Sequence, residues 1–473
     1  MKFILESVEL AERPVRLRLP FRFGVITLTE APQAFLSVRI RTADGRQGQG
    51  LAASMLAPKW FDKSPEHDND TNIDHLRQAV AIAAAAYRHD GQARTGYGHF
   101  AANYQAVVDT AAARGINALS ASFGPALLDA ALVDALGQAV ELPFGELARR
   151  NVLGLQPEVL APDLATFDTS AWLAERKLAG RMAARHTVGL VDPIASLADS
   201  ERTTHDGLPE TLAEVIERYG HRHFKLKVSG DLPADLDRLT RIAAVLDRAE
   251  LPYQATLDGN EQFDSVEPVE QLWRRMTETP ALTRLVNSIV FIEQPIKRTA
   301  TMTEPVHAMA RHKALIIDES DDSLEAFPRA LALGYSGVSS KLCKGLYKSL
   351  TNAARCAQAN AAGQPWFMSA EDLTNQAGVA VQQDLALVNL IGLDHVERNG
   401  HHYVDGFGGA PAAIQQAFAA DHPDLYRRDG DASRLNIEAG HLNIGSLNSA
   451  GFALGPQARQ AVLESLSNTF QGV

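Results

Sequence analysis

Short strand-like runs alternate with amphipathic helical segments from about residue 187 onward. The runs are HTVGLV, HFKLKV, YQATLD, SIVFIEQ, ALIIDES, GVSSKLC, PWFMSAE and LDHVERN. Such alternation is typical of repeated βα units and a parallel sheet. Eight runs, recurring every roughly 25 to 35 residues, favour a closed barrel, which spends about 250 residues on eight units. We therefore expect an α/β fold with a TIM-type barrel.

The first part of the chain has a different pattern, which predicts a small α+β unit. RLRLPFRFG and FLSVRIRTADGRQGQG alternate apolar and polar residues, and both end in turn-forming residues. A polar segment, PKWFDKSPEHDNDTN, precedes an Ala-rich helix expected over residues 74–87. A second helix is expected in GPALLDAALVDALGQAV, whose leucines and alanines recur with helical period. The two domains should meet between residues 150 and 185.

Length, charge and cysteine content narrow the class of protein. A chain of 473 residues exceeds the usual size of one hydrophobic core. The net charge of −12, without blocks of Lys and Arg, argues against nucleic acid or an anionic membrane as partner. Two cysteines, Cys343 and Cys356, are too few for a disulfide framework. The start, MKFILESVELAERP, lacks the apolar core of a signal peptide, and no stretch approaches a membrane span. We expect a cytoplasmic protein.

Charged residues stand at the ends of five consecutive strand-like runs. They are Lys225 and Lys227, Asp258, Glu293, Asp318 and Lys341. The loops that follow barrel strands open at their C-terminal ends, where such enzymes carry their catalytic groups. The carboxylates are thus expected to converge between lysines.

Three ionised carboxylates in one place need a cation. Asp258, Glu293 and Asp318 offer hard oxygen ligands, which favour Mg²⁺ or Mn²⁺ over zinc. Other interpretations exist for each position: Asp258 suits a helix cap or an Asx-turn with the next residue, and Glu319 competes with Asp318 for the ligand role. The occurrence of a carboxylate at the end of each of three adjacent strands therefore favours the metal site.

The lysines suit proton transfer. In HFKLKV, period 2 places Lys225 and Lys227 on one face and the apolar residues on the other. Two close lysines lower each other's pKa, and a neutral lysine can act as a base. The alternative is an exposed edge strand with outward lysines. Lys341 is expected on the far side of the carboxylates, from where a proton could be returned to the opposite face of a carbon. Lys344 should lie beyond the strand, at a helix start.

The ordered motifs resemble those of the enolase superfamily. Lys-x-Lys, Asp-x-Asn, Glu-Gln-Pro, Asp-Glu-Ser and Lys-x-x-Lys follow one another as in its mandelate racemase and muconate-lactonizing-enzyme-like family, specifically the subgroup with two catalytic lysines. PFRFG and TADGRQGQG resemble that family's N-terminal cap, and GFALG resembles its closing segment. The resemblance implies a modified (β/α)₇β barrel over residues 171–410. It also implies an N-terminal α+β capping domain over 1–170 and a C-terminal segment, 411–473, that returns toward the cap.

The resemblance also implies a role for each motif residue. Asp258, Glu293 and Asp318 would hold Mg²⁺ or Mn²⁺, and Lys227 and Lys341 would be the acid/base pair. For the substrate, Lys225 would hold the carboxylate and lower the pKa of its neighbouring lysine, and Asn260 would support the site by hydrogen bonding.

Specificity residues are expected in the cap and after the last strands. Candidates are residues 21–24, including Phe23, the loop near Trp60, and Glu371 or Glu397 at strand ends. His401 and His402 are more typical of surface polar residues than of ligands. The chain departs from the subgroup after Gly345, where a second glycine is common and Leu346 stands here.

The function implied is removal of the proton α to a substrate carboxylate, giving a metal-stabilised enediolate. Racemisation, epimerisation or cycloisomerisation would follow from lysines on two faces. The alternatives are a sugar-acid dehydratase and a non-catalytic barrel that binds a metal and an anion. The expected partner is a small carboxylic acid, with neither nucleic acid nor membrane, in a homo-oligomer.

Overall fold

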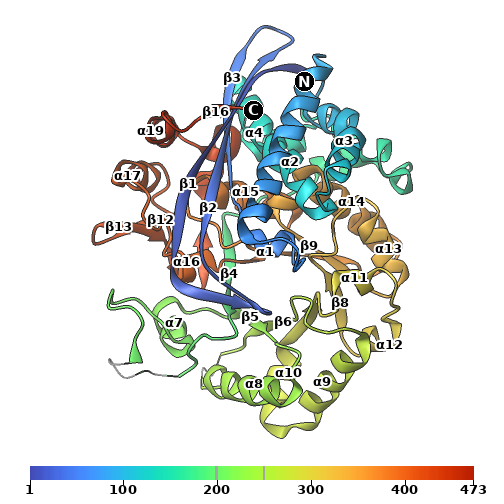
Figure 1. The fold of residues 1–473 in the computed structure, drawn as a ribbon, viewed down its shortest axis with the longest axis vertical. Helices are drawn as coiled ribbons and strands as arrows, with labels where there is room; N and C mark the ends of the chain where they lie inside the picture. Colours follow the sequence, from blue (N-terminus) through green and yellow to red (C-terminus); the bar gives the residue numbers. More distant parts are fainter. Residues whose placement is uncertain (196, 198–200, 249–250) are drawn as a thin grey trace.

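The computed structural model describes residues 1–195, 197, 201–248 and 251–473. The chain begins with a long antiparallel hairpin, β1 (Phe3–Phe23) and β2 (Ile26–Thr42), to which β3 (Gln47–Met55) adds. The register runs from Phe3 opposite Thr42 to Phe23 opposite Ile26, with an irregularity before Phe21. Figure 1 shows this sheet in blue, standing beside the cap helices with its hairpin end reaching toward the barrel.

The helices of the first domain pack on one another and on this sheet. They are α1 (Pro58–Phe61), α2 (Asn69–Asp90), α3 (Gly96–Ala113), α4 (Ala118–Val140), α5 (Phe144–Arg149) and α6 (Thr169–Ala174). α2 begins where Asp68 accepts a hydrogen bond from Thr71 N and ends at Gly91, which takes a left-handed conformation. The expected domain boundary at residue 170 falls inside α6.

The helix α4 is unusually long and apolar. α4 is 23 residues long and passes a length-and-composition test for a membrane span, so the expectation that no stretch approaches one was wrong. Its most apolar window is 94% buried inside the protein. Such a helix is explained by its place in the core, between α2, α3 and the sheet.

Eight parallel strands form the barrel. They are β4 (Arg181–Val188), β5 (His223–Lys227), β6 (Gln254–Asp258), β7 (Ile289–Glu293), β8 (Ala314–Ile317), β9 (Gly337–Ser340), β10 (Phe367–Ala370) and β11 (His395–Glu397). Consecutive strands pair in parallel from β4 to β10, and β11 pairs with β4, which returns the last strand to the first. The expected (β/α)₇β architecture is confirmed.

Helical segments lie in all seven connections between these strands. In chain order they are α7 (Leu212–Tyr219), α8 (Leu232–Leu246), α9 (Val266–Glu278), α10 (Thr283–Ser288), α11 (Arg298–Thr301), α12 (His307–Ala310), α13 (Ala326–Ala332), α14 (Leu346–Ala361) and α15 (Val379–Ile391). They surround the sheet on its outer side (Figure 1). Three of these strands, β5, β6 and β7, are five residues long, and most of their residues are buried.

The C-terminal residues contact both domains. After α16 (Gly400–Tyr403), α17 (Ala412–Asp421) and the hairpin of β12 (Tyr426–Asp429) and β13 (Ala432–Leu435), β14 (Ile437–Glu438) and β15 (His441–Asn443) extend the sheet beside β4. α18 (Ala450–Ala453), α19 (Pro456–Leu466) and β16 (Gln471–Gly472) then reach the first domain, where β16 pairs with β1.

A buried carboxylate joins these parts. Asp134 of α4 accepts hydrogen bonds from Leu51 N at 3.0 Å, Phe452 N at 3.0 Å and Arg459 Nη2 at 2.9 Å. The GFALG motif, residues 451–455, is therefore held against the first domain by one side chain.

Candidate active site

The strand ends converge as the sequence predicts. Asp258, Glu293 and Asp318 are each 0% exposed and stand at the C-terminal ends of β6, β7 and β8. Period 2 turns both lysines of β5 inward, since Lys225 and Lys227 each contact a carboxylate of this group. The alternative of an exposed edge strand is wrong.

Lys225 occupies the centre of the carboxylate group. Its Nζ atom lies 2.9 Å from Asp258 Oδ2, 2.9 Å from Glu293 Oε2, 2.8 Å from Glu371 Oε2 and 3.2 Å from Glu397 Oε2. Burial by itself lowers the pKa of Lys225, but the four negative charges outweigh burial and raise that pKa well above its ordinary value. The expected lowering by a neighbouring lysine is therefore wrong for Lys225, because carboxylates surround it.

The carboxylates fit a divalent cation. Burial, joined by the charges of Asp258 and Glu371, raises the pKa of Glu293 well above its ordinary value. Glu293 Oε2 is buried, and the cation that it faces, Lys225 Nζ, is shared with three other carboxylates. Such a set of buried oxygens suits Mg²⁺ or Mn²⁺.

Asp318 connects to a pair of lysines on the other side. Its Oδ2 atom lies 2.5 Å from Lys341 Nζ, and its Oδ1 atom lies 3.3 Å from Lys344 Nζ. Burial lowers the pKa of Lys341, but the charges of Asp318, Glu293 and Glu319 together reverse the effect and raise it. Lys344 does stand just before α14, yet its side chain turns back to the site, which the sequence analysis did not predict.

Glu319 is buried beside Asp318 and has different neighbours. Its Oε1 atom accepts a hydrogen bond from Asn260 Nδ2 at 3.2 Å and lies 3.4 Å from Lys63 Nζ, whereas its Oε2 atom has no partner. The loop that carries both acids is fixed by Gln294 of the Glu-Gln-Pro motif. Gln294 Oε1 accepts from Asp318 N at 2.8 Å and from Ser320 N at 3.1 Å.

Asp258 serves two purposes. Its Oδ1 atom accepts the backbone N–H of Asn260 at 2.9 Å, as in an Asx-turn, and its Oδ2 atom lies 2.6 Å from Lys227 Nζ. Burial acts to raise the pKa of Asp258, but the charges of Lys225 and Lys227 hold it below its usual value. The turn interpretation and the site interpretation therefore both apply.

A small cavity lies between the lysines and the first domain. Its volume is about 30 Å³, and its wall includes Phe21, Phe23, Leu28, Ala57, Trp60, Lys225, Lys227, Asn260, Lys341, Asp372, Leu373, Thr374, Glu397 and Asn399. The ring of Trp60 lies 4.2 Å from Lys341 Nζ, and the ring of Phe21 lies 5.7 Å from Lys227 Nζ. Each predicted catalytic lysine is thus covered by one aromatic side chain of the first domain.

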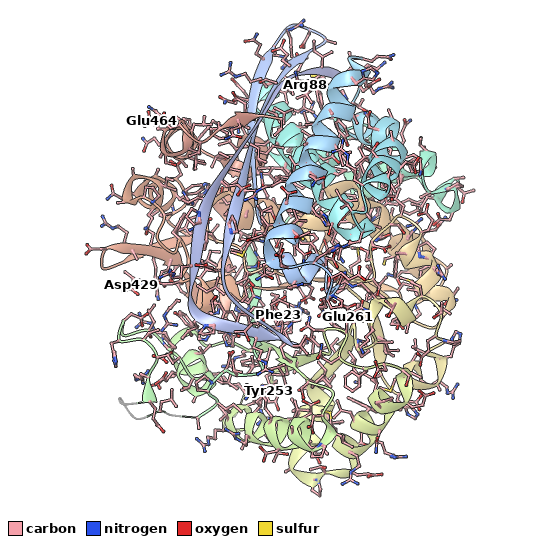
Figure 2. The ribbon with its side chains drawn as sticks, in the orientation of Figure 1. Phe23, Arg88, Tyr253, Glu261, Asp429 and Glu464 are labelled. Carbon is pink, nitrogen blue, oxygen red and sulfur yellow. The ribbon has the colours of Figure 1, made fainter. Side chains whose placement is uncertain are left out.

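An ion-pair cluster holds α1, which carries Trp60, in place. Arg298 donates to the carbonyls of Trp60 and Phe61 at 3.0 and 2.9 Å, and its Nε atom donates to Glu261 Oε1 at 2.7 Å. Lys63 contributes a second cation, 2.6 Å from Glu261 Oε2. Figure 2 labels Glu261 and Phe23 near the centre of the molecule, where the two domains meet. Glu261 therefore ties the turn after β6 to the cap.

The two glutamates expected near substrate have unequal positions. Glu397 is part of the cavity wall, whereas Glu371 lies behind Lys225 and is paired with Arg185 at 2.5 Å. Arg185 was not predicted, although a charge inside the apolar run of β4 was a signal for it. Asp372, Thr374 and Asn399, which follow β10 and β11, were not assigned a role in advance either.

The histidines after β11 are not surface residues. His401 and His402 are 8% and 4% exposed, so the expectation of surface polar side chains was wrong. The short helix α16 places them against the outside of β4 rather than at the solvent. Cys343, 5% exposed, has its pKa raised to about 12 by burial, which keeps it a protonated packing residue.

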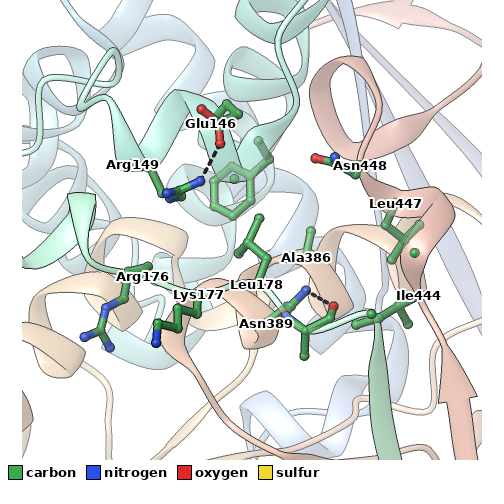
Figure 3. A pocket seen from close by; sticks show the side chains of 15 residues that line it. Glu146, Arg149, Arg176, Lys177, Leu178, Ala386, Asn389, Ile444, Leu447 and Asn448 are labelled. Carbon is green, nitrogen blue, oxygen red and sulfur yellow. Dashed lines mark hydrogen bonds and ion pairs between the residues drawn. The ribbon is translucent and has the colours of Figure 1, made fainter.

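A larger pocket lies at the other end of the strands. Its volume is about 500 Å³, and its wall includes Glu146, Arg149, Arg176, Lys177 and Asn389, in part from the segment that precedes β4 (Figure 3). None of the predicted site residues lines it. Since catalytic groups of such barrels stand at the C-terminal strand ends, we place the candidate site at the smaller cavity.

Residues 208–424 match the family described as enolase C-terminal domain-like. No curated protein matches the chain. A dipeptide epimerase from Enterococcus faecalis V583, complexed with Mg and the dipeptide L-Leu-L-Tyr, is 16% identical, with a TM-score of 0.60 over 96% of this chain and 99% of that one. A muconate lactonizing enzyme from Pseudomonas fluorescens, complexed with muconolactone, is 18% identical, with a TM-score of 0.55 over 98% and 99%.

A third solved structure also matches over nearly the whole length of both chains. It is an enolase from Bradyrhizobium complexed with magnesium and mandelic acid, 16% identical, with a TM-score of 0.57 over 98% of both chains. At these identities the likeness concerns the fold. Residues 208–424 are thus similar to the enolase C-terminal domain-like family, and the whole chain shares the overall fold of these solved structures.

Proposed function

We propose that this protein is an enzyme that removes the proton α to a substrate carboxylate, as a racemase, epimerase or cycloisomerase. Asp258, Glu293 and Asp318 would hold Mg²⁺ or Mn²⁺. When bound, the ion supplies positive charge beside the substrate carboxylate. Lys227 and Lys341 would move the proton.

The observation that carries this proposal is the placement of the two lysines. Lys227 ends β5 and Lys341 follows β9, so three strands with carboxylate ends stand between them. Both line the same cavity. A non-catalytic anion site would need positive charge, but it would not need two buried amines that approach one cavity from two sides.

The remaining residues hold the substrate and exclude water. The charges of Lys225 and Lys341 attract a carboxylate, and Asn260 and Glu397 offer polar atoms at the wall. Phe21, Phe23 and Trp60 cover the lysines with apolar rings, which excludes water and strengthens electrostatic interactions in the cavity.

Proton exchange tests the first step directly. The protein is incubated with Mg²⁺ and a library of carboxylic acids in D₂O, including dipeptides, acylated amino acids, hydroxy acids and muconate-like diacids. We expect exchange at the α-carbon of at least one acid. Lys227→Ala and Lys341→Ala should each lower the rate about 10²- to 10⁴-fold, the range for a positioned acid or base. Lys297→Ala, which removes an exposed lysine paired with Asp264, is the control.

The outcomes separate the alternatives. Exchange accompanied by inversion of configuration at the α-carbon indicates racemisation or epimerisation. Loss of water from a hydroxy acid indicates a sugar-acid dehydratase. Mg²⁺ binding without exchange of any acid would support the non-catalytic barrel. Exchange that persists in both lysine variants would contradict the roles proposed for them.

Metal titration tests the ligand set. Asp258→Asn, Glu293→Gln and Asp318→Asn should each weaken Mg²⁺ binding measured by calorimetry. Glu319→Gln is the matched comparison, since it stands next in sequence and is equally buried. If Glu319→Gln weakens binding and Asp318→Asn does not, Glu319 is the third ligand.

We also propose that the protein forms a homo-oligomer. Light scattering of the purified chain would test this proposal.

A further inference from the structure

Three histidines from separate segments meet in the interior, on the outer face of the barrel wall. His186 stands on β4, His221 lies between α7 and β5, and His401 belongs to α16. They are 2%, 3% and 8% exposed. One nitrogen from each lies within 4.8 Å of the other two. Arg185, the residue before His186, points to the catalytic side instead, where it pairs with a glutamate.

The hydrogen bonds define which nitrogens are available. His221 Nδ1 lies 2.9 Å from the carbonyl oxygen of Ala184. A carbonyl only accepts, so Nδ1 carries the hydrogen and Nε2 carries a lone pair. His221 Nε2 is buried and has no hydrogen-bond partner. A buried acceptor without a partner is unfavourable, and a bound metal would supply that partner.

The other two rings face each other at a spacing that suits a metal. His186 Nδ1 and His401 Nε2 lie 3.2 Å apart and share a hydrogen bond, which a metal bound by both nitrogens would replace. Zn²⁺ binds imidazole nitrogen at about 2.0–2.1 Å with tetrahedral geometry, which sets ligand nitrogens about 3.3 Å apart. The bond from His221 to Ala184 O matches the way in which metal-binding histidines are usually oriented by a backbone carbonyl.

Protonation does not oppose binding. Burial lowers the pKa of His221 to about 4, and it also lowers the pKa of His186 and His401 well below the ordinary value. All three rings are therefore neutral at pH 7, the form that binds metals. No carboxylate belongs to this group of three, which favours a nitrogen-seeking metal over Mg²⁺.

We propose that His186, His221 and His401 form a binding site for a divalent transition metal, with Zn²⁺ as the best fit. The site is separate from the carboxylate group and does not depend on the proposed catalytic function. Its role would be structural, because it joins β4, the α7–β5 connection and α16. α16 also carries Tyr403, whose ring stacks on Phe21 of the cavity wall at 4.2 Å, so the site would support that wall.

Cobalt binding tests the site. The chelator-treated full chain is titrated with Co²⁺, both in its native state and during refolding from denaturant, so that slow entry into the interior cannot hide binding. We expect one Co²⁺ per chain to give the strong visible absorption of four-coordinate cobalt, which Zn²⁺ displaces, whereas Co²⁺ held by the carboxylate group would absorb only weakly. His221→Gln should weaken binding at least about 100-fold, since loss of a supporting partner alone costs 10- to 100-fold. If that variant does not fold, His401→Gln, at the edge of the cluster, replaces it.

Two controls separate this site from others. His75→Gln removes a member of a second group, Asp62, His67 and His75, and should leave the cobalt absorption unchanged. Glu293→Gln should weaken Mg²⁺ binding without affecting the four-coordinate cobalt absorption. The proposal is overturned if the wild-type chain develops no four-coordinate cobalt absorption in either protocol, if His221→Gln and His401→Gln develop it as wild type does, or if His75→Gln loses it equally.

Discussion

Glu261→Gln is expected to destabilise the protein by about 3 kcal/mol at pH 7. The side chain is 4% exposed, and its two oxygens face Arg298 at 2.7 and 2.8 Å and Lys63 at 2.6 Å. Burial raises the pKa of Glu261, but these cations outweigh burial and lower it from 4.5 to about 2. A difference of about 2.5 pKa units at 1.36 kcal/mol each gives the magnitude, and removal of one partner of a buried pair costs a similar about 3–5 kcal/mol.

The sign of the pH dependence follows from the direction of the shift. The folded-state pKa of Glu261 is below its unfolded value, so the stabilisation is complete above about pH 5 and is lost as the pH falls through 4.5 toward 2. The glutamine has no such dependence. The difference in unfolding free energy between wild type and Glu261→Gln should thus shrink to less than half of its neutral value by about pH 3.

Urea unfolding between pH 7 and pH 3, followed by tryptophan fluorescence, measures this difference. Glu12→Gln is the matched control, because Glu12 pairs with Arg77 through two 2.7 Å hydrogen bonds on the surface. The Glu12 variant should lose at most about 1 kcal/mol. A Glu261 variant with wild-type stability, or a difference that stays constant down to pH 3, would refute the reasoning.

Three further results are expected. Asp134→Asn should lower the unfolding free energy by about 1–3 kcal/mol in urea, because three donors lose a buried carboxylate. Cys343 and Cys356, whose pKa values burial raises to about 12, should react with a thiol reagent at pH 8 only after denaturation, when two thiols per chain are counted. Mg²⁺ at 100 times its Kd should stabilise the wild type by about 2.7 kcal/mol in calorimetry, and Glu293→Gln should lose that gain.

The sequence predicted the parts of the site that follow from local rules. Period 2 in β5 was enough to turn Lys225 and Lys227 inward, because alternation along a strand does not depend on distant contacts. The strand-end positions of Asp258 and Glu293 follow from the βα pattern alone. Both features were available before any tertiary structure was considered.

Features that depend on closure of the barrel were not predictable in this way. Glu371 and Glu397 reach Lys225 from β10 and β11, more than a hundred residues later in the chain, so the rise in the pKa of Lys225 could not be read locally. Lys344 turns back to Asp318 through a 3₁₀ turn that helical periodicity does not reveal. His401 was misassigned for the same reason, since segments distant in sequence, among them β1 and the rings of His186 and His221, bury α16.

The strand β4 divides two polar clusters, and the inner one holds buried charges that stability alone does not explain. Arg185 and Thr187 face inward, where both reach glutamates of the catalytic group, and His186 faces outward. Buried charges usually cost more in desolvation than their pairing returns, so apolar residues would give a more stable wall. Clusters of perturbed buried groups occur mainly at functional sites. On this argument, the inner cluster would be retained for the proposed proton transfer beside a cation, and the outer histidines for the proposed transition metal that would hold the wall from behind.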